Sequence, residues 1–114
     1  MEEFDILKYV FDTLKPLDIP VYFVSKKEVS PPMVVFNITG ERGNVFWEND
    51  EQETVYKITV NIFSRTNFIK YKNQIMKLMK GAGFLKYDVP SCIYLEDVDM
   101  FNQPLQFRFY REIN

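Results

Sequence analysis

Three acidic side chains stand close together near the C-terminal end of the sequence, and they are the first candidates for chemistry. Glu96 and Asp97 are adjacent, and Asp99 follows two residues later. Neighbouring carboxylates can bind a divalent cation or share general acid and base roles, provided that further groups converge on them from other segments. The sequence alone gives no evidence of such groups. We therefore interpret this cluster as the solvent-exposed end of a strand and expect no metal site.

The other residue types restrict catalysis further. The chain has no histidine and one cysteine, Cys92, which excludes zinc sites, Cys–His or Ser–His pairs and a disulfide within one chain. Glycines occur in residues 40–43 and 81–83, but neither segment has the spacing of a phosphate-binding loop. We interpret the first as a turn and the second as the end of a helix. We therefore expect no enzymatic activity and no cofactor.

Charge is segregated along the chain. Residues 66–86 contain five lysines and no acidic residue, whereas residues 41–53 contain five acids and one arginine. On a helix, Lys70, Lys77 and Lys80 fall within an arc of about 80°. These lysines form either a solvated helix face or a basic patch that meets an acidic patch of another copy or of a partner.

A connection of 14 residues, 40–53, has an aromatic centre among acids. We interpret it as a long loop between two strands. Its aromatic residues either pack back onto the core or serve as exposed anchors for a protein partner. The candidate interface residues of this segment are Phe46, Trp47, Glu48, Asp50 and Glu51.

Hydrophobic periodicity predicts the elements that must position these residues. We expect helices at residues 2–15 and 65–82, and strands at 19–24, 33–39, 54–64, 92–98 and 105–111. The strand at 54–64 has the clearest pattern, with apolar residues at 56, 58, 60 and 62 alternating with polar ones. Residues 26–32 are predicted as a polar connection and 102–104 as a hairpin-like turn. The order is αβββαββ.

This order predicts one α+β domain over residues 1–114, built as a two-layer sandwich with a mainly antiparallel sheet and two helices on one face. With 46% hydrophobic and 26% charged residues, the chain has enough apolar surface to fold. Its net charge of −2 argues against general affinity for nucleic acid. The apolar runs are shorter than the roughly 20 residues of a membrane helix, and the acidic N-terminus is unlike a secretory signal. We expect cytosolic synthesis and no membrane association.

The C-terminal half of the chain resembles a known family. The alternating strand ends in Ile62-Phe63-Ser64 and is followed by the amphipathic helix, Gly83-Phe84, an acidic strand and a last strand containing residues 106–109, Gln-Phe-Arg-Phe. This succession over about residues 54–111 resembles the small tail-completion proteins of tailed bacteriophages and prophages, also called tail terminator or head-to-tail joining proteins. Their pattern is one of residue types, without an invariant signature.

The resemblance implies a structural role without catalytic residues. Such proteins form rings, typically hexamers, that cap the finished tail tube and offer a surface to the head connector. The resemblance thus implies three partners: other copies of the chain, the tail tube protein and the head-connector protein. It also implies synthesis in the bacterial cytoplasm and a final place in the virion. Two alternatives stay open: a small ligand-binding or regulatory domain, and a nucleic-acid module that uses the lysine face.

Overall fold

The computed structural model describes residues 4–24, 31–43, 46–47, 50–51 and 53–112. Glu48 lies outside the described residues, as do positions 26–30 of the predicted polar connection. The elements, in chain order, are α1 (Ile6–Leu14), β1 (Val21–Phe23), β2 (Met33–Gly43), β3 (Phe46–Trp47), β4 (Asp50–Glu51), β5 (Glu53–Ser64), α2 (Ile69–Gly81), β6 (Leu85–Asp88), β7 (Ile93–Leu95), the 3₁₀ turn η1 (Glu96–Val98) and β8 (Met100–Glu112).

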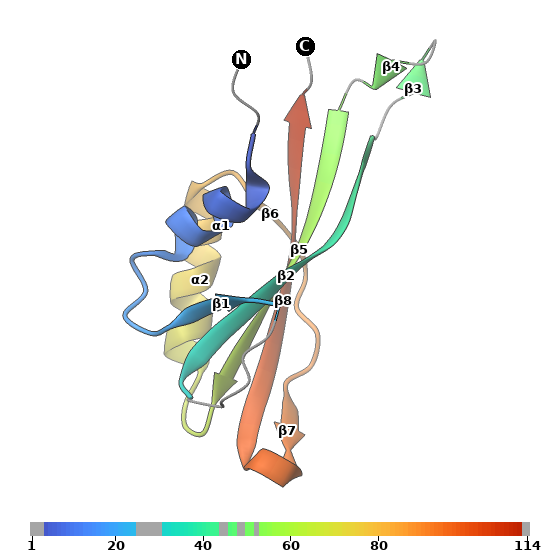
Figure 1. The fold of residues 1–114 in the computed structure, drawn as a ribbon. Coiled ribbons are helices and arrows are strands. Elements are labelled where there is room, and N and C mark those ends of the chain that lie inside the picture. Colours follow the sequence, from blue (N-terminus) through green and yellow to red (C-terminus); the bar gives the residue numbers. More distant parts are fainter. Residues whose placement is uncertain (1–3, 25–30, 44–45, 48–49, 52, 113–114) are drawn as a thin grey trace.

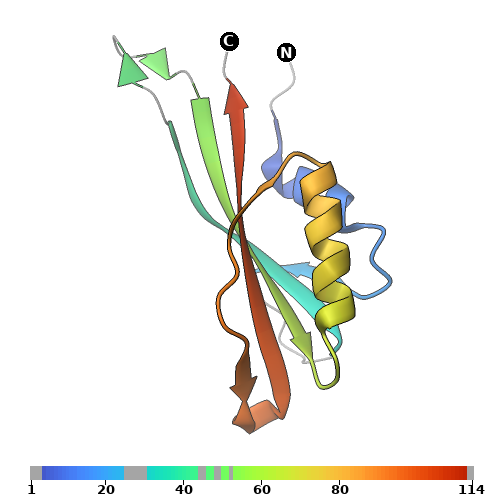
Figure 2. The ribbon, with the colours of Figure 1, turned by 180° about the vertical axis from the view of Figure 1, so that it is seen from behind.

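A six-stranded sheet forms one layer and the two helices form the other (Figure 1). The strand order is β1-β2-β5-β8-β6, and β7 also pairs with β8. Only the pairing of β1 with β2 is parallel among the described strands of this sheet. Both helices lie on the same face of the sheet, as the view from behind also shows (Figure 2). The predicted α+β class with two helices on one face is confirmed, with three more strands than the predicted order contains.

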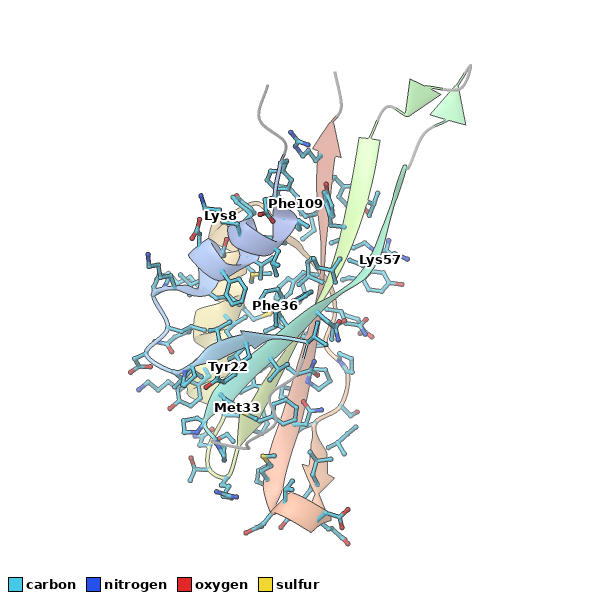
Figure 3. The ribbon with its side chains drawn as sticks, viewed as in Figure 1. Lys8, Tyr22, Met33, Phe36, Lys57 and Phe109 are labelled. Atoms are coloured by element: carbon cyan, nitrogen blue, oxygen red, sulfur yellow. The ribbon has the colours of Figure 1, made fainter. Side chains whose placement is uncertain are left out.

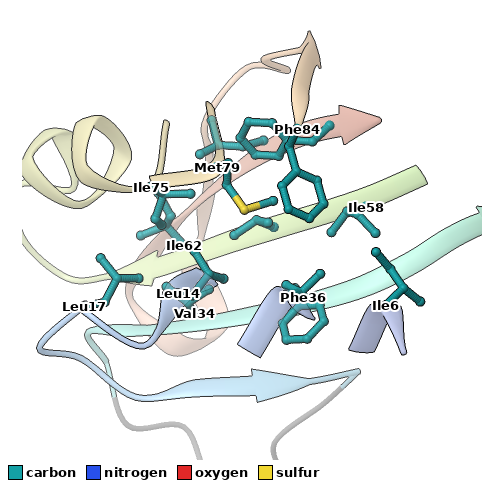
Figure 4. Close-up of a cluster of buried hydrophobic side chains, with 14 of the residues drawn as sticks. Ile6, Leu14, Leu17, Val34, Phe36, Ile58, Ile62, Ile75, Met79 and Phe84 are labelled. Atoms are coloured by element: carbon teal, nitrogen blue, oxygen red, sulfur yellow. The ribbon is translucent and has the colours of Figure 1, made fainter. Parts of the chain in front are cut away.

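Strand β5 is the centre of the sheet, and its pattern agrees with the prediction. Ile58, Val60 and Ile62 are buried among the helices. Lys57 lies on the opposite side of the sheet from the helices, whereas Phe36 and Phe109 point toward them (Figure 3). The cross-strand neighbours of these residues complete the core, because directly opposed residues share a face. Figure 4 shows the apolar cluster in which Phe36, Ile58, Ile75, Met79 and Phe84 meet.

Both helices are shorter than predicted, because polar side chains compete for the backbone at their first turns. Asp5 caps α1, accepting a hydrogen bond from the Lys8 N–H at 3.1 Å, so the helix begins at Ile6 instead of residue 2. Before α2, the Ser64 hydroxyl accepts a hydrogen bond from the Thr66 N–H at 3.1 Å. That local bond holds residues 64–66 in a turn, and the helix begins at Ile69 instead of residue 65.

The predicted turn at 102–104 is wrong. The chain reverses earlier, at η1, where Asp99 adopts a left-handed conformation with φ 51°. β8 then runs without interruption through Pro104. Of the described strands, β7 pairs with residues 100–102 of β8 and β6 with residues 106–108, so neither pairs with Pro104 itself. On this side, β8 has no partner at Pro104 among the described strands, so proline, which has no backbone N–H to donate, is tolerated there.

Candidate functional site

The lysine face predicted on the second helix divides into two parts in the structure. Lys70, Lys77 and Lys80 are all exposed on α2, as expected. Lys77 and Lys80 line a groove between α2 and β6, together with Lys86. Lys70 does not line this groove; its ammonium group lies 5.8 Å from the centroid of the Tyr71 ring. The structure therefore brings two of the three predicted lysines together and adds a third that the sequence prediction missed.

The groove has a volume of about 570 Å³ and a largely apolar floor. Phe84 and Phe107 are each 2% exposed and belong to the core, whereas Leu85 is 58% exposed at the rim. The remaining lining residues are Asn73 and Met76. None of the described residues that line the groove is acidic. The groove therefore combines an apolar surface with three cationic groups, a composition suited to an occupant that is both acidic and apolar.

Gly83 places β6 beside α2 and so creates the groove. Its φ of +93° lies in the region that favours glycine. The Gly83 N–H donates to the Lys80 carbonyl at 3.1 Å, and the Phe84 N–H donates to the Met79 carbonyl at 3.0 Å. These two bonds are a Schellman motif, which satisfies the last carbonyls of the helix and turns the chain sharply. The turn places Phe84 in the core, 4.9 Å between ring centroids from Phe109, and starts β6 one residue later.

The acidic segment 40–53 is not a loop throughout, which corrects two predictions. Residues 40–43, predicted as a turn, belong to β2 and pair with residues 57–54 of β5. The register shifts between Ile38 and Gly40, as at a β-bulge, where glycine is common. The hairpin of β2 and β5 therefore extends beyond the body of the molecule.

A two-stranded ribbon, β3 with β4, stands at the end of this hairpin (Figure 1). It contains four of the five candidate interface residues of the segment: Phe46 is opposite Glu51 and Trp47 is opposite Asp50. In both views the ribbon lies far from α2 (Figures 1 and 2). Within one copy, the structure therefore does not bring the acidic ribbon and the lysines together.

The acidic cluster near the C-terminus forms part of a turn. Glu96 and Asp97 lie in η1 instead of the strand predicted for 92–98, which ends at Leu95. The Tyr94 hydroxyl donates a hydrogen bond to the Asp99 carboxylate, and this bond, with smaller effects of desolvation and of the Asp99 charge, raises the pKa of Tyr94. No group of three or more potential metal ligands occurs among the residues that the structure describes. Burial also raises the pKa of Cys92, which makes its thiol less nucleophilic near neutral pH.

Sequence reasoning also missed the apolar edge of the sheet. β6 was not predicted, although Leu85 and Tyr87 alternate there with polar residues in the pattern of a short strand. Leu85, Tyr87, Ile93 and Tyr94 are between 47% and 58% exposed along β6 and β7. The guanidinium of Arg108 stacks over the Tyr87 ring at 3.8 Å from its centroid. No described helix is long and apolar enough to cross a membrane.

Comparisons with known proteins give a likeness of fold. Neither a protein-family model nor a curated protein matches the sequence. Among solved structures, the gp17 protein of bacteriophage SPP1 is similar to this chain, with a TM-score of 0.54 and 14% sequence identity. The similarity covers 96% of this chain and 88% of gp17. This chain therefore shares the fold of a bacteriophage protein.

Proposed function

We propose that this chain is a structural virion protein of a tailed bacteriophage or prophage, which forms a ring at the head-proximal end of the tail and joins the tail to the head connector. The observation that carries the proposal is the likeness to gp17 of bacteriophage SPP1, which extends over 96% of the chain. The resemblance of residues 54–111 to tail-completion proteins rests on residue types and supports the same role. Two lines of reasoning, one from the backbone and one from the sequence, thus favour a phage protein.

The proposal includes the partners and excludes catalysis. The chain would contact other copies of itself in a hexamer, the tail tube protein on one side and the head-connector protein on the other. It would need no cofactor, and it would not bind a specific nucleic acid sequence. It would be made in the cytoplasm of the bacterial host and remain in the finished particle at the neck of the tail.

Replacing both Phe46 and Trp47 by serine tests this role. We expect the thermal midpoint to stay nearly unchanged, because both residues lie in the ribbon at the end of the hairpin. We expect tail joining to be lost, because Trp and other aromatic anchors dominate the affinity of protein interfaces. The measurement is complementation: a phage lacking this gene is supplied with either version, and electron micrographs are scored for joined particles. Joined particles without any functional copy of the gene would refute the proposal.

A second function is favoured by another groove, of about 600 Å³, between α1 and α2. Leu17 and Leu78 are among its lining residues, and its size is within the roughly 300–1,000 Å³ of small-molecule sites. The chain would then be a ligand-binding or regulatory domain. A small molecule that raises the thermal midpoint of the purified protein, together with joined particles when the gene is absent, would favour this alternative.

A further inference from the structure

The groove between α2 and β6 suits an occupant that carries negative charge and apolar surface together. Lys77, Lys80 and Lys86 supply the positive charge, and Met76 and Phe107 contribute apolar floor. An apolar occupant alone would leave the lysines without complementary charge, and a small anion alone would leave the apolar floor uncovered. At about 570 Å³ the groove is within the usual size of sites that bury a compact ligand.

The β3–β4 ribbon has this composition. Its register pairs Phe46 with Glu51 and Trp47 with Asp50. Two of these four residues are aromatic and two are acidic. The composition of the ribbon is therefore complementary to that of the groove, in charge and in apolar character.

We infer that this groove receives the β3–β4 ribbon of a second copy of the chain. The ribbon lies far from α2 of its own copy in both views, so the contact must form between copies (Figures 1 and 2). Groove and ribbon are different surfaces, so the contact is heterologous and generates a closed ring when its rotation divides the circle. The inference rests on the proposed ring and names the surfaces that hold neighbouring copies together.

Each contact of this kind is weak alone, and ring closure makes it stable. Exposed ion pairs contribute little individually, and salt screens them. In a ring, however, each copy engages two neighbours at once, which raises the effective concentration of every contact. The experiment must therefore capture a weak contact between free copies as well as the contact in assembled tails.

Cross-linking with a short bismaleimide provides such a capture. All variants carry Cys92→Ser, so that the engineered thiols alone react. One copy carries Asn73→Cys, which lines the groove, and the other carries Asp50→Cys in the ribbon. The matched control is Gln74→Cys, which neighbours Asn73 on α2 but lines the groove on the α1 side. We expect cross-linked dimers from the Asn73→Cys mixture at a rate at least roughly tenfold above the control, both in concentrated purified protein and in isolated tails.

Charge reversal then tests the electrostatic part. Lys77→Glu with Lys80→Glu in the groove copy should lower the cross-linking rate about tenfold or more, since two charges that attract the remaining Glu51 of the ribbon would then repel it. Glu51→Lys in the ribbon copy should restore part of the rate. Lys70→Glu, on the same helix but outside the groove, should change it little. Circular dichroism of each variant checks that the fold is retained.

Two results would overturn the inference. Equal cross-linking at Asn73→Cys and Gln74→Cys would show that the ribbon does not select this groove. No cross-link in either purified protein or isolated tails would show that the two surfaces do not meet. Failure of the proposed function is a different result, namely joined particles without the gene. If the phage requires the gene but the cross-link is absent, the ring role stands and this contact is wrong.

Discussion

Gly81 and Gly83 lie two residues apart at the end of α2, but alanine should affect them in opposite directions. Gly83 has φ +93°, a conformation that disfavours any residue with a Cβ atom. A Cβ atom there would meet the Phe109 ring at 3.5 Å, an ordinary van der Waals contact, so backbone strain is the main cost. Gly81 is the last residue of the helix, and a Cβ atom there meets nothing within 4 Å. Because neither position is crowded, the pair isolates the cost of backbone strain at Gly83.

The magnitudes follow from these conformations. Gly83→Ala should lower the free energy of unfolding by roughly 1–2 kcal/mol, the cost of a left-handed residue with a Cβ atom. Gly81→Ala should raise it by roughly 0.5–1 kcal/mol, because alanine restricts the unfolded chain and favours the helix. The two variants should then differ by roughly 1.5–3 kcal/mol, which separates their urea midpoints by about 1 M at an m-value of about 1–3 kcal/mol/M.

Urea unfolding followed by far-ultraviolet circular dichroism measures both variants under the same conditions. A Gly83→Ala protein as stable as the wild type would refute the reasoning, because α2 would then not end in a left-handed turn. The direction in which the chain enters β6, and the shape of the groove that depends on it, would then also differ from the structure described above. Equal destabilisation by both substitutions would instead indicate that the end of the helix is crowded, contrary to the open space at Gly81.

Two further predictions concern the sheet and the turn before β8. Ile58→Ala should lower the free energy of unfolding by roughly 2–5 kcal/mol and Thr59→Ala by much less, since only Ile58 belongs to the core; equal losses would contradict the register. Asp99→Asn should lower the raised pKa of Tyr94 in a spectrophotometric titration, because a neutral amide is a weaker acceptor. Because the pKa of Tyr94 is raised in the folded protein, this pair stabilises the fold below the usual tyrosine pKa, and the stabilisation is lost as the pH rises through the raised value. If Tyr94 has the same pKa in the Asp99→Asn variant and in the wild type, the pairing is contradicted.

The sequence predicts the parts of the fold in which one residue pattern determines which side is buried. In β5 the alternation of apolar and polar residues identifies the core face correctly at Ile58, Val60 and Ile62. In α2 the three-to-four spacing correctly places Ile75 and Met79 against the sheet. These are local signals, because the period of an element determines which of its residues share a face.

Two of the wrong predictions occur where residues distant in sequence decide the conformation. Two glycines within 40–43 favour a turn locally, yet pairing with β5 draws this segment into the sheet. Pro104 favours a break, yet β8 continues because neither edge strand pairs at its position. Local propensity is a weak guide in strands, since the partners that stabilise each strand come from elsewhere in the chain.

The same limit explains why the sequence predicted only part of the candidate site. A projection down the helix axis places Lys70 beside Lys77 and Lys80, because it shows only the angle of each residue around the axis and not its position along the axis. Ten residues separate Lys70 from Lys80, which is about 15 Å at the rise of an α-helix. β6 follows directly after the end of α2 and forms a groove with the helix from Asn73 to Lys80, and Lys70 does not line it. The Gly83 turn thus determines which lysines belong to the groove, and it brings Lys86 to them from a strand that periodicity did not predict.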